Sequence, residues 1–68
     1  MPSTVIKHFT YRHEARELVV EFVTGRVYIY ADVPPEEAER FRAAFSKGRY
    51  FNAHIRDGYR CRELARRA

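Results

Sequence analysis

The sequence predicts a small α+β domain, in which a three-stranded antiparallel β-meander is packed against one main helix and a short second helix. Residues 18–23 alternate between two faces with a period of two, as a half-buried strand does. The turn Thr24-Gly25 leads into residues 27–30, so the two segments are typical of a hairpin. Pro34-Pro35 then ends the strand-rich part, and apolar residues at helical spacing follow.

Length and composition limit the chain to one domain. It has 68 residues, of which 46% are hydrophobic and 15% aromatic, enough for one small core. The longest run of hydrophobic residue types, residues 27–31, is far shorter than the roughly 20 residues of a membrane span. No apolar stretch of a secretion signal follows Met1, and the single cysteine, Cys61, excludes an intramolecular disulfide and a cysteine-based zinc cluster. We therefore expect a protein of the reducing cytoplasm.

The first strand is expected at residues 4–11, where β-branched and aromatic residues mix with polar ones. Neither face of this segment is purely apolar, so a bulge or an edge position would let both Ile6 and Tyr11 reach the core. The next strand, residues 18–23, is the clearest. Its core face consists of Leu18, Val20 and Phe22. Gly25 gives the following turn the freedom to adopt a positive φ.

Two helices are expected after the proline pair. Pro35 suits the first helical turn, where its missing N–H is not needed, and two glutamates follow it where the helix dipole favours negative charge. The face that would cover the sheet consists of Ala38, Phe41 and Phe45. Gly48 is expected to end this helix with a positive φ. Residues 49–56, with Phe51 and Ile55 four apart, are expected to form the second helix.

The chain divides into a domain at residues 1–59 and a basic C-terminal tail at residues 60–68. One side of a helix in the tail would consist of Cys61, Leu64, Ala65 and Ala68. A helix of about ten residues is marginal in water unless it docks. Both a docked helix and a frayed tail therefore remain open.

The charge is unevenly distributed. The formal net charge is +4, but residues 1–39 carry −3 and residues 40–68 carry +7. Of the 13 basic residues only Lys7 and Lys47 are lysines, and the guanidinium of arginine pairs bidentately with phosphate or carboxylate and stacks on rings. The second segment therefore suits a polyanion, although a basic face that serves only solubility explains it equally well.

The order of these features resembles the KTSC domain, a small domain found at the C-terminus of some lysyl-tRNA synthetases and as stand-alone bacterial proteins. The resemblance runs from about Ser3 to Tyr59. It rests on Ile6, Phe9, Tyr11, Leu18, Val20, Phe22, Gly25, Tyr28-Ile29-Tyr30, Val33-Pro34, Phe41, Ser46-Lys47-Gly48-Arg49-Tyr50-Phe51-Asn52 and Ile55. Ala38, where the family has larger residues, and the arginine-rich tail depart from the pattern. The resemblance implies a fold and no established activity; RNA binding is suggested for the family by its occurrence in the synthetases.

Two aromatic residues in the third strand have two interpretations. Tyr28 and Tyr30 lie side by side on one face, the spacing with which sheet-based RNA-binding domains stack successive bases. Alternatively, the two rings belong to the core and keep their hydroxyl groups at its rim. We favour the core interpretation, because tyrosine commonly buries its ring.

The segment Ser46-Lys47-Gly48-Arg49 connects the two expected helices. Backbone N–H groups at the start of the second helix, with Lys47 and Arg49, would hold a phosphate. The patch would be extended by Tyr50, Asn52 and Arg56. The alternative, which we favour as the primary role, is a connector that Ser46 caps. The segment lacks the phosphate loop of nucleotide-hydrolysing folds.

Catalytic and metal-binding patterns are missing from the sequence. The three histidines and Cys61 do not have the spacing of metal ligands. A nucleophilic pair of Cys61 and His54 would need a thiolate of low pKa in a formed pocket. We therefore expect no enzyme activity, no metal and no cofactor.

The resulting hypothesis is a non-catalytic module that binds RNA or another structured nucleic acid. Its expected site residues are Lys47, Arg49, Arg56, Arg60 and Arg62 on phosphates, with Tyr50 or His54 as a stacking surface and Asn52 beside them. The alternative is a protein-interaction module that recognises an acidic partner or self-associates through an exposed strand edge, the first strand above all. A third possibility is that the tail folds only on binding. A membrane partner is not expected, and the oligomeric state stays open.

Overall fold

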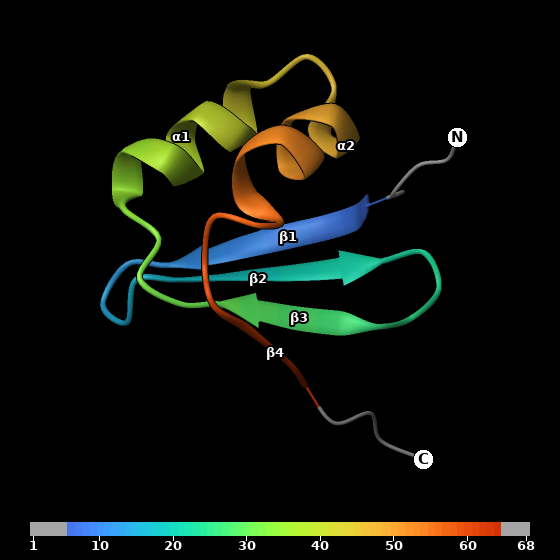
Figure 1. Ribbon diagram of the computed structural model, residues 1–68, viewed down its shortest axis with the longest axis horizontal. Coiled ribbons are helices and arrows are strands. Elements are labelled where there is room, and N and C mark those ends of the chain that lie inside the picture. Colours follow the sequence, from blue (N-terminus) through green and yellow to red (C-terminus); the bar gives the residue numbers. More distant parts are fainter. Residues whose placement is uncertain (1–5, 65–68) are drawn as a thin grey trace.

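An antiparallel sheet carries the helices on one of its faces (Figure 1). The computed structural model describes residues 6–64. The strands follow one another across the sheet in chain order: β1 (Ile6–Arg12), β2 (Glu17–Phe22), β3 (Val27–Tyr30) and β4 (Cys61–Glu63). Between β3 and β4 lie α1 (Pro35–Ala43), α2 (Lys47–Tyr50) and the π-helix η1 (Phe51–Ile55). The α+β class is confirmed, but the described sheet has four strands where the sequence predicts three.

The fourth strand lies at the start of the tail, for which the sequence leaves a docked helix and a frayed segment open. Cys61 lies opposite Tyr30 in an antiparallel pairing, and the Leu64 N–H donates to the Val27 carbonyl at 2.8 Å. Residues 61–64 are all exposed, so their apolar spacing has no buried face to fill, and backbone hydrogen bonds hold the segment instead. The other two members of the expected helical face, Ala65 and Ala68, lie outside the described residues.

The pairing of β1 with β2 contains the expected bulge. Ile6 lies opposite Phe22 and His8 opposite Glu21, so Lys7 is the extra residue. The shift turns residues from both ends of β1 toward the core, where Ile6, Phe9 and Tyr11 all pack. The prediction that a bulge brings Ile6 and Tyr11 to the same face is confirmed. The first two residues of the expected strand, residues 4 and 5, lie outside the described residues.

The β2–β3 hairpin forms as predicted. Gly25 has a φ of 95°, a left-handed conformation that glycine adopts without steric cost. Its N–H donates to the Phe22 carbonyl at 2.9 Å, and the Phe22 N–H donates to the Arg26 carbonyl at 2.9 Å. The turn therefore aligns β2 with β3 and sets Arg26 directly after it.

The core fills the space between the helices and the sheet. Its buried members are Leu18, Val20, Tyr30, Val33, Phe41, Phe51 and Ile55. The Phe51 ring meets Phe22 and Tyr30 edge to face, with centroid distances of 5.5 and 5.4 Å. Phe51 and Ile55 are both buried, as their spacing predicts, although the turn between them is a π-turn in which the Arg56 N–H donates to the Phe51 carbonyl at 2.8 Å.

Two predictions around the end of α1 are wrong. Phe45, expected on the buried face, is fully exposed, because α1 ends at Ala43 and the extended conformation of Ala44 takes the chain off the helical path. Gly48 lies inside α2 and has no positive φ. The ammonium group of Lys47, not a left-handed glycine, satisfies the end of α1, since it donates to the Ala44 carbonyl at 2.8 Å.

The contrast between Phe41 and Phe45 gives a first prediction. Phe41→Ala removes a fully buried ring and should cost about 3–5 kcal/mol, enough to unfold a domain of this size. Phe45→Ala removes the same ring from solvent and should change the free energy of unfolding by less than about 0.5 kcal/mol. Urea unfolding followed by tyrosine fluorescence measures both. Equal effects of the two substitutions would contradict this difference in packing.

Candidate nucleic-acid interface

A buried carboxylate joins α1 to α2. Glu37, in the first turn of α1, is only 8% exposed. Its Oε2 accepts a hydrogen bond from the Tyr50 hydroxyl at 2.7 Å, and its Oε1 accepts one from Arg40 Nη2 at 3.2 Å. The sequence assigns Glu37 only a helix-dipole role. The signal for its burial is its position four residues before Phe41, on the same helical face.

The pKa of each tyrosine near this carboxylate is raised. For Tyr50, burial is the largest cause and the hydrogen bond to Glu37 the next, because ionisation would place a second negative charge beside the first. For Tyr59, which packs against the core just before β4, burial is again the largest cause and the charge of Glu37 follows. Glu37 therefore ties α1 to α2 through Tyr50, and its charge also disfavours ionisation of Tyr59.

Tyr50 and His54 stack on one another in the basic segment. Their ring centroids are 4.4 Å apart and the rings are inclined by 36°, while the other neighbour of the Tyr50 ring is Phe41, at 5.9 Å. Tyr50 thus contacts two other rings, and its hydroxyl is engaged by Glu37. Of the two expected stacking surfaces, only His54 is exposed.

The connector between α1 and α2 is held by its own contacts. Ser46 Oγ accepts a hydrogen bond from the Arg49 N–H at 3.3 Å, which confirms the cap. Lys47 donates to the end of α1, so its ammonium group is engaged within the fold. The Arg49 N–H, at the start of α2, is thus already engaged by Ser46 and is not available to a phosphate. The local structure therefore favours the connector role.

The exposed face of the continuous α2–η1 helix carries three of the expected site residues. They are Arg49, Asn52 and Arg56, spaced three and four apart and all exposed, opposite the buried Phe51 and Ile55. Arg60 is exposed in the loop that follows. Within residues 6–64, Arg49, Arg56 and Arg60 take part in no ion pair, and Arg16 is the only other arginine of this range of which that is true.

Arg62 lies apart from the other site residues. Arg62 pairs with Ile29 in the sheet. Because Tyr28 and Tyr30, the chain neighbours of Ile29, face the helices, Ile29 and Arg62 lie on the opposite sheet face. The guanidinium of Arg62 is 3.8 Å from Glu17 Oε2. The structure therefore does not place Arg62 on the same surface as Arg49 and Arg56.

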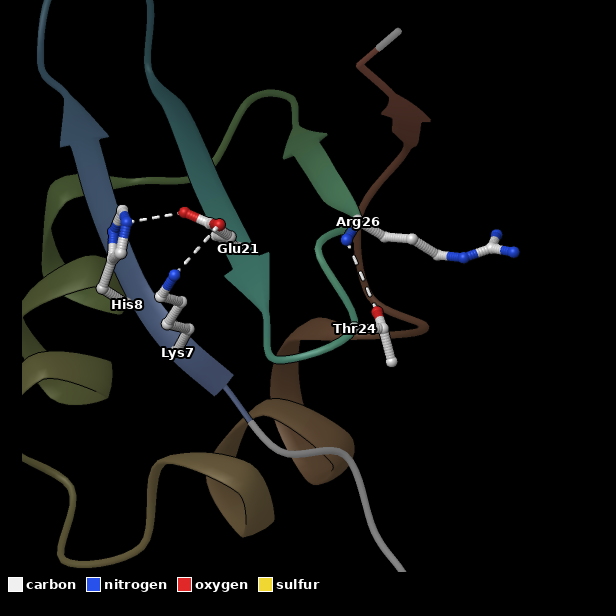
Figure 2. Close-up of polar contacts among 5 residues, drawn as sticks. All are labelled: Lys7, His8, Glu21, Thr24 and Arg26. Atoms are coloured by element: carbon white, nitrogen blue, oxygen red, sulfur yellow. Dashed lines mark hydrogen bonds and ion pairs between the residues drawn. The ribbon is translucent and has the colours of Figure 1, made fainter. Parts of the chain in front are cut away.

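Ion pairs follow the uncovered face of the sheet. Figure 2 shows Lys7 and His8 of β1 both directed at Glu21 of β2, with N–O distances of 3.9 and 2.7 Å. On the same sheet, Glu17 is shared between Arg12, at 3.7 Å, and Arg62. The positive charges of this face are thus balanced by neighbouring carboxylates, unlike those of the α2–η1 face.

Tyr28 and Tyr30 differ in their burial. Tyr30 is 4% exposed and belongs to the core, and burial is the largest cause of its strongly raised pKa. Tyr28 is half-buried, with its ring edge to face against Phe22 at a centroid distance of 5.8 Å. The core interpretation is confirmed for Tyr30, and the ring of Tyr28 stays partly accessible.

A pocket of about 540 Å³ opens beside Tyr28, between the β2–β3 turn and the end of η1. Its lining consists of Phe22, Val23, Thr24, Arg26, Tyr28, Tyr30, Phe51, Arg56, Asp57 and Cys61. A smaller hollow of about 220 Å³ shares Cys61 with it and is otherwise lined by Ala31, Arg60 and Arg62. Arg26 is a candidate site residue that the sequence did not single out. Its only sequence signal is its position directly after the hairpin glycine.

The described residues show neither a metal centre nor a membrane span. In residues 6–64, no group of three or more His, Cys, Asp or Glu side chains is arranged to hold a metal ion. No helix of the same range is long and apolar enough to cross a membrane.

The fold and the sequence both match a known family. The model of the KTSC domain matches residues 2–59. The chain belongs to the KTSC domain family. A crystal structure of a KTSC domain protein from Yersinia pestis superposes with a TM-score of 0.85 at 32% identity, covering 96% of this chain and 92% of that one. The resemblance seen in the sequence is therefore confirmed.

Two relatives of this KTSC domain differ in length. A lysine–tRNA ligase of Nostoc punctiforme is 39% identical over 63 residues, which are 93% of this chain and 11% of the ligase. An uncharacterized protein of Stutzerimonas stutzeri is 38% identical over 52 residues, which are 76% of this chain and 73% of that protein. The chain thus spans about a tenth of the length of the ligase it matches.

The raised tyrosine pKa values predict a pH dependence of stability. Tyr30, Tyr50 and Tyr59 are held neutral in the fold, whereas in the unfolded chain tyrosine ionises near pH 10. Their contribution is fully present below about pH 10 and is lost as the pH rises above it. The urea midpoint should stay constant from about pH 8 to 9.5 and fall toward pH 11, and Tyr50→Phe should make that fall shallower. A midpoint that does not change up to pH 11 would refute the prediction.

Proposed function

We propose that this KTSC domain is a non-catalytic module that binds RNA, with the exposed face of α2 and η1 and the loop before β4 on the phosphate backbone. The observation that carries the proposal is the set of arginines that no carboxylate neutralises. Arg49, Arg56 and Arg60 take part in no ion pair among residues 6–64, whereas Arg12, Arg26, Arg40, Arg42 and Arg62 all do. Arg16, in the turn before β2, is the other described arginine without an ion pair, and Arg49 and Arg56 share the exposed face of α2 and η1.

The chemistry of this surface suits a phosphate backbone. Guanidinium groups bind phosphate oxygens bidentately, and a row of them releases counterions as the nucleic acid binds. His54 lies on the same helix, stacked on Tyr50, and offers an exposed ring to a neighbouring base. Lys47 and Arg62, engaged by Ala44 and Glu17, contribute less to this surface than their sequence positions suggest.

The relatives also support RNA as the partner. A lysine–tRNA ligase, by its name, acts on a tRNA, and a segment of it is 39% identical to this chain. A small domain attached to such an enzyme would contribute to function by holding the tRNA, which requires binding and no chemistry. We assign this binding to the arginines named above.

A charge-matched pair of double variants tests the proposal. Arg49→Ala/Arg56→Ala removes two arginines without ion pairs, and Arg12→Ala/Arg42→Ala removes two that pair with Glu17 and Glu39, so both variants lose the same net charge. In titrations of tRNA and of a single-stranded RNA at several salt concentrations, the wild type should bind more weakly as salt rises. The first variant should lower the slope of log K against log salt by about 1.4, that is by about 0.7 for each phosphate that an arginine no longer neutralises.

The control double variant should bind almost as the wild type does. Absence of RNA binding at low salt, or equal reductions of affinity in the two variants, would overturn the proposal. The second outcome would mean that RNA senses only the net charge of the domain.

Self-association through a strand edge is the competing function, and β1 is indeed an edge of the sheet. Its seven residues leave one side of a backbone ladder unpaired within the described sheet, which is a template for a second strand. However, the bulge at Lys7 and the charges of Lys7 and Arg12 are features that block edge pairing. We therefore expect a monomer at about 100 μM in analytical ultracentrifugation. A dimer that Thr10→Ala leaves intact but Thr10→Pro abolishes would favour the edge, since Thr10 is exposed and only proline removes the backbone N–H.

A further inference from the structure

The pocket beside Tyr28 has aromatic walls that phosphate binding alone would not require. Its volume of about 540 Å³ falls within the range of about 300–1,000 Å³ that is typical of small-molecule sites. Two of its aromatic rings, Tyr30 and Phe51, are buried and form a rigid base. The rings of Phe22 and Tyr28 are only half-buried, so part of their surface faces the pocket. The pocket is therefore a partly open cavity with aromatic walls, next to the packed core.

Cations flank this aromatic surface on two sides. Arg26 approaches from the β2–β3 turn, which Gly25 bends and in which Thr24 Oγ1 accepts a hydrogen bond from the Arg26 N–H at 3.4 Å (Figure 2). Arg56 approaches from the last turn of η1, whose position is set by the burial of Ile55. Both arginines line the pocket. Arg56 takes part in no ion pair among residues 6–64, whereas Arg26 Nη1 lies 3.7 Å from Glu63 Oε1 in an exposed pair with which a phosphate would compete. The site thus combines stacking surfaces with groups that bind phosphate.

Polar groups complete the lining. Asp57 supplies a carboxylate that accepts hydrogen bonds, and Thr24 supplies a hydroxyl that both donates and accepts. A purely apolar ligand would make no hydrogen bonds to these polar groups, and a simple anion would make no stacking contact with the rings. A nucleotide uses both, because its base has aromatic faces and hydrogen-bonding edges and its phosphates carry the negative charge.

We propose that this pocket receives one unpaired base of a bound RNA, stacked against Tyr28, while Arg26 and Arg56 hold the phosphates on either side of that nucleotide. The inference rests on the proposed function, since it specifies the form of RNA that the same module binds. Arg56 belongs both to the phosphate-binding surface and to the pocket, so the two sites are continuous. Bases inside a duplex are stacked and paired and do not enter, so the module selects single-stranded segments.

Cys61 provides a direct reporter for the pocket. It is exposed, it lines the pocket, and it is the single cysteine of the chain. A base inside the pocket therefore shields its thiol from alkylation by N-ethylmaleimide. We expect a saturating single-stranded oligonucleotide to slow alkylation at least about tenfold. An oligonucleotide of the same length with abasic sites throughout, and a duplex, should give little protection at equal occupancy.

The outcomes separate this inference from the proposed function. If RNA does not bind in the salt titration, the proposed function itself is wrong. If RNA binds but the abasic strand protects Cys61 as well as the normal strand, or neither strand protects it, the base-binding pocket is wrong and the phosphate contacts stand. Protection by the normal strand alone supports both.

Substitutions of Tyr28 test the stacking contact without relying on the thiol. Tyr28→Leu keeps an apolar side chain against Phe22 but removes the aromatic face, and Tyr28→Phe keeps the face and loses only the hydroxyl. The leucine variant should lower the affinity for the single strand about tenfold and leave the affinity for the abasic strand unchanged. The phenylalanine variant should bind as the wild type. Urea unfolding confirms that each variant is folded, and equal affinities of the leucine and phenylalanine variants for the single strand would overturn the inference.

Discussion

The hydrogen bond between the Tyr50 hydroxyl and the buried Glu37 carboxylate is the contact on which the position of the basic segment depends. A helix as short as α2 has no stability of its own in water, so tertiary contacts must hold it. Glu37 supplies a charge-assisted contact from α1, while Phe51 and Ile55 anchor the following turn in the core. With the inner face fixed in this way, Arg49 and Arg56 are left exposed on the outer side of the helix.

The sequence predicts the parts of the fold that depend on buried periodic residues. The alternation in β2, the glycine turn and the four-residue spacing of Phe51 and Ile55 all reflect burial, and all three appear in the structure. The prediction that Phe45 is buried is wrong because Phe45 would share a helical face with Phe41 only if α1 continued past Ala43. The predicted glycine stop at the end of α1 is replaced by a hydrogen bond from Lys47 to the Ala44 carbonyl. The sequence also does not predict strand β4. All of its side chains are exposed, so no apolar pattern marks it, and its pairing partner β3 is distant in sequence.

The candidate site shows a similar division between what composition reveals and what needs coordinates. The charge excess after residue 40 directs attention to α2, η1 and the following loop. It does not reveal that Lys47 is engaged by a carbonyl, that Arg62 points to the opposite face, or that Arg26 joins Arg56 across a pocket. Each of these depends on a long-range pairing or a local cap, and counts of charge along a sequence carry no information about either.

Strand β4 is held by its backbone, and this has a consequence for how its residues can vary. Because Cys61, Arg62 and Glu63 are all exposed, no packing requirement fixes their identity, and any residue able to extend and donate an N–H would pair with β3. Strand β4 therefore places three side chains at a sheet edge, and its pairing with β3 does not depend on which side chains they are. Cys61, the β4 residue that lines the pocket beside Tyr28, can therefore be exchanged at little cost to folding, so the chemistry of the pocket rim can change while the architecture stays constant.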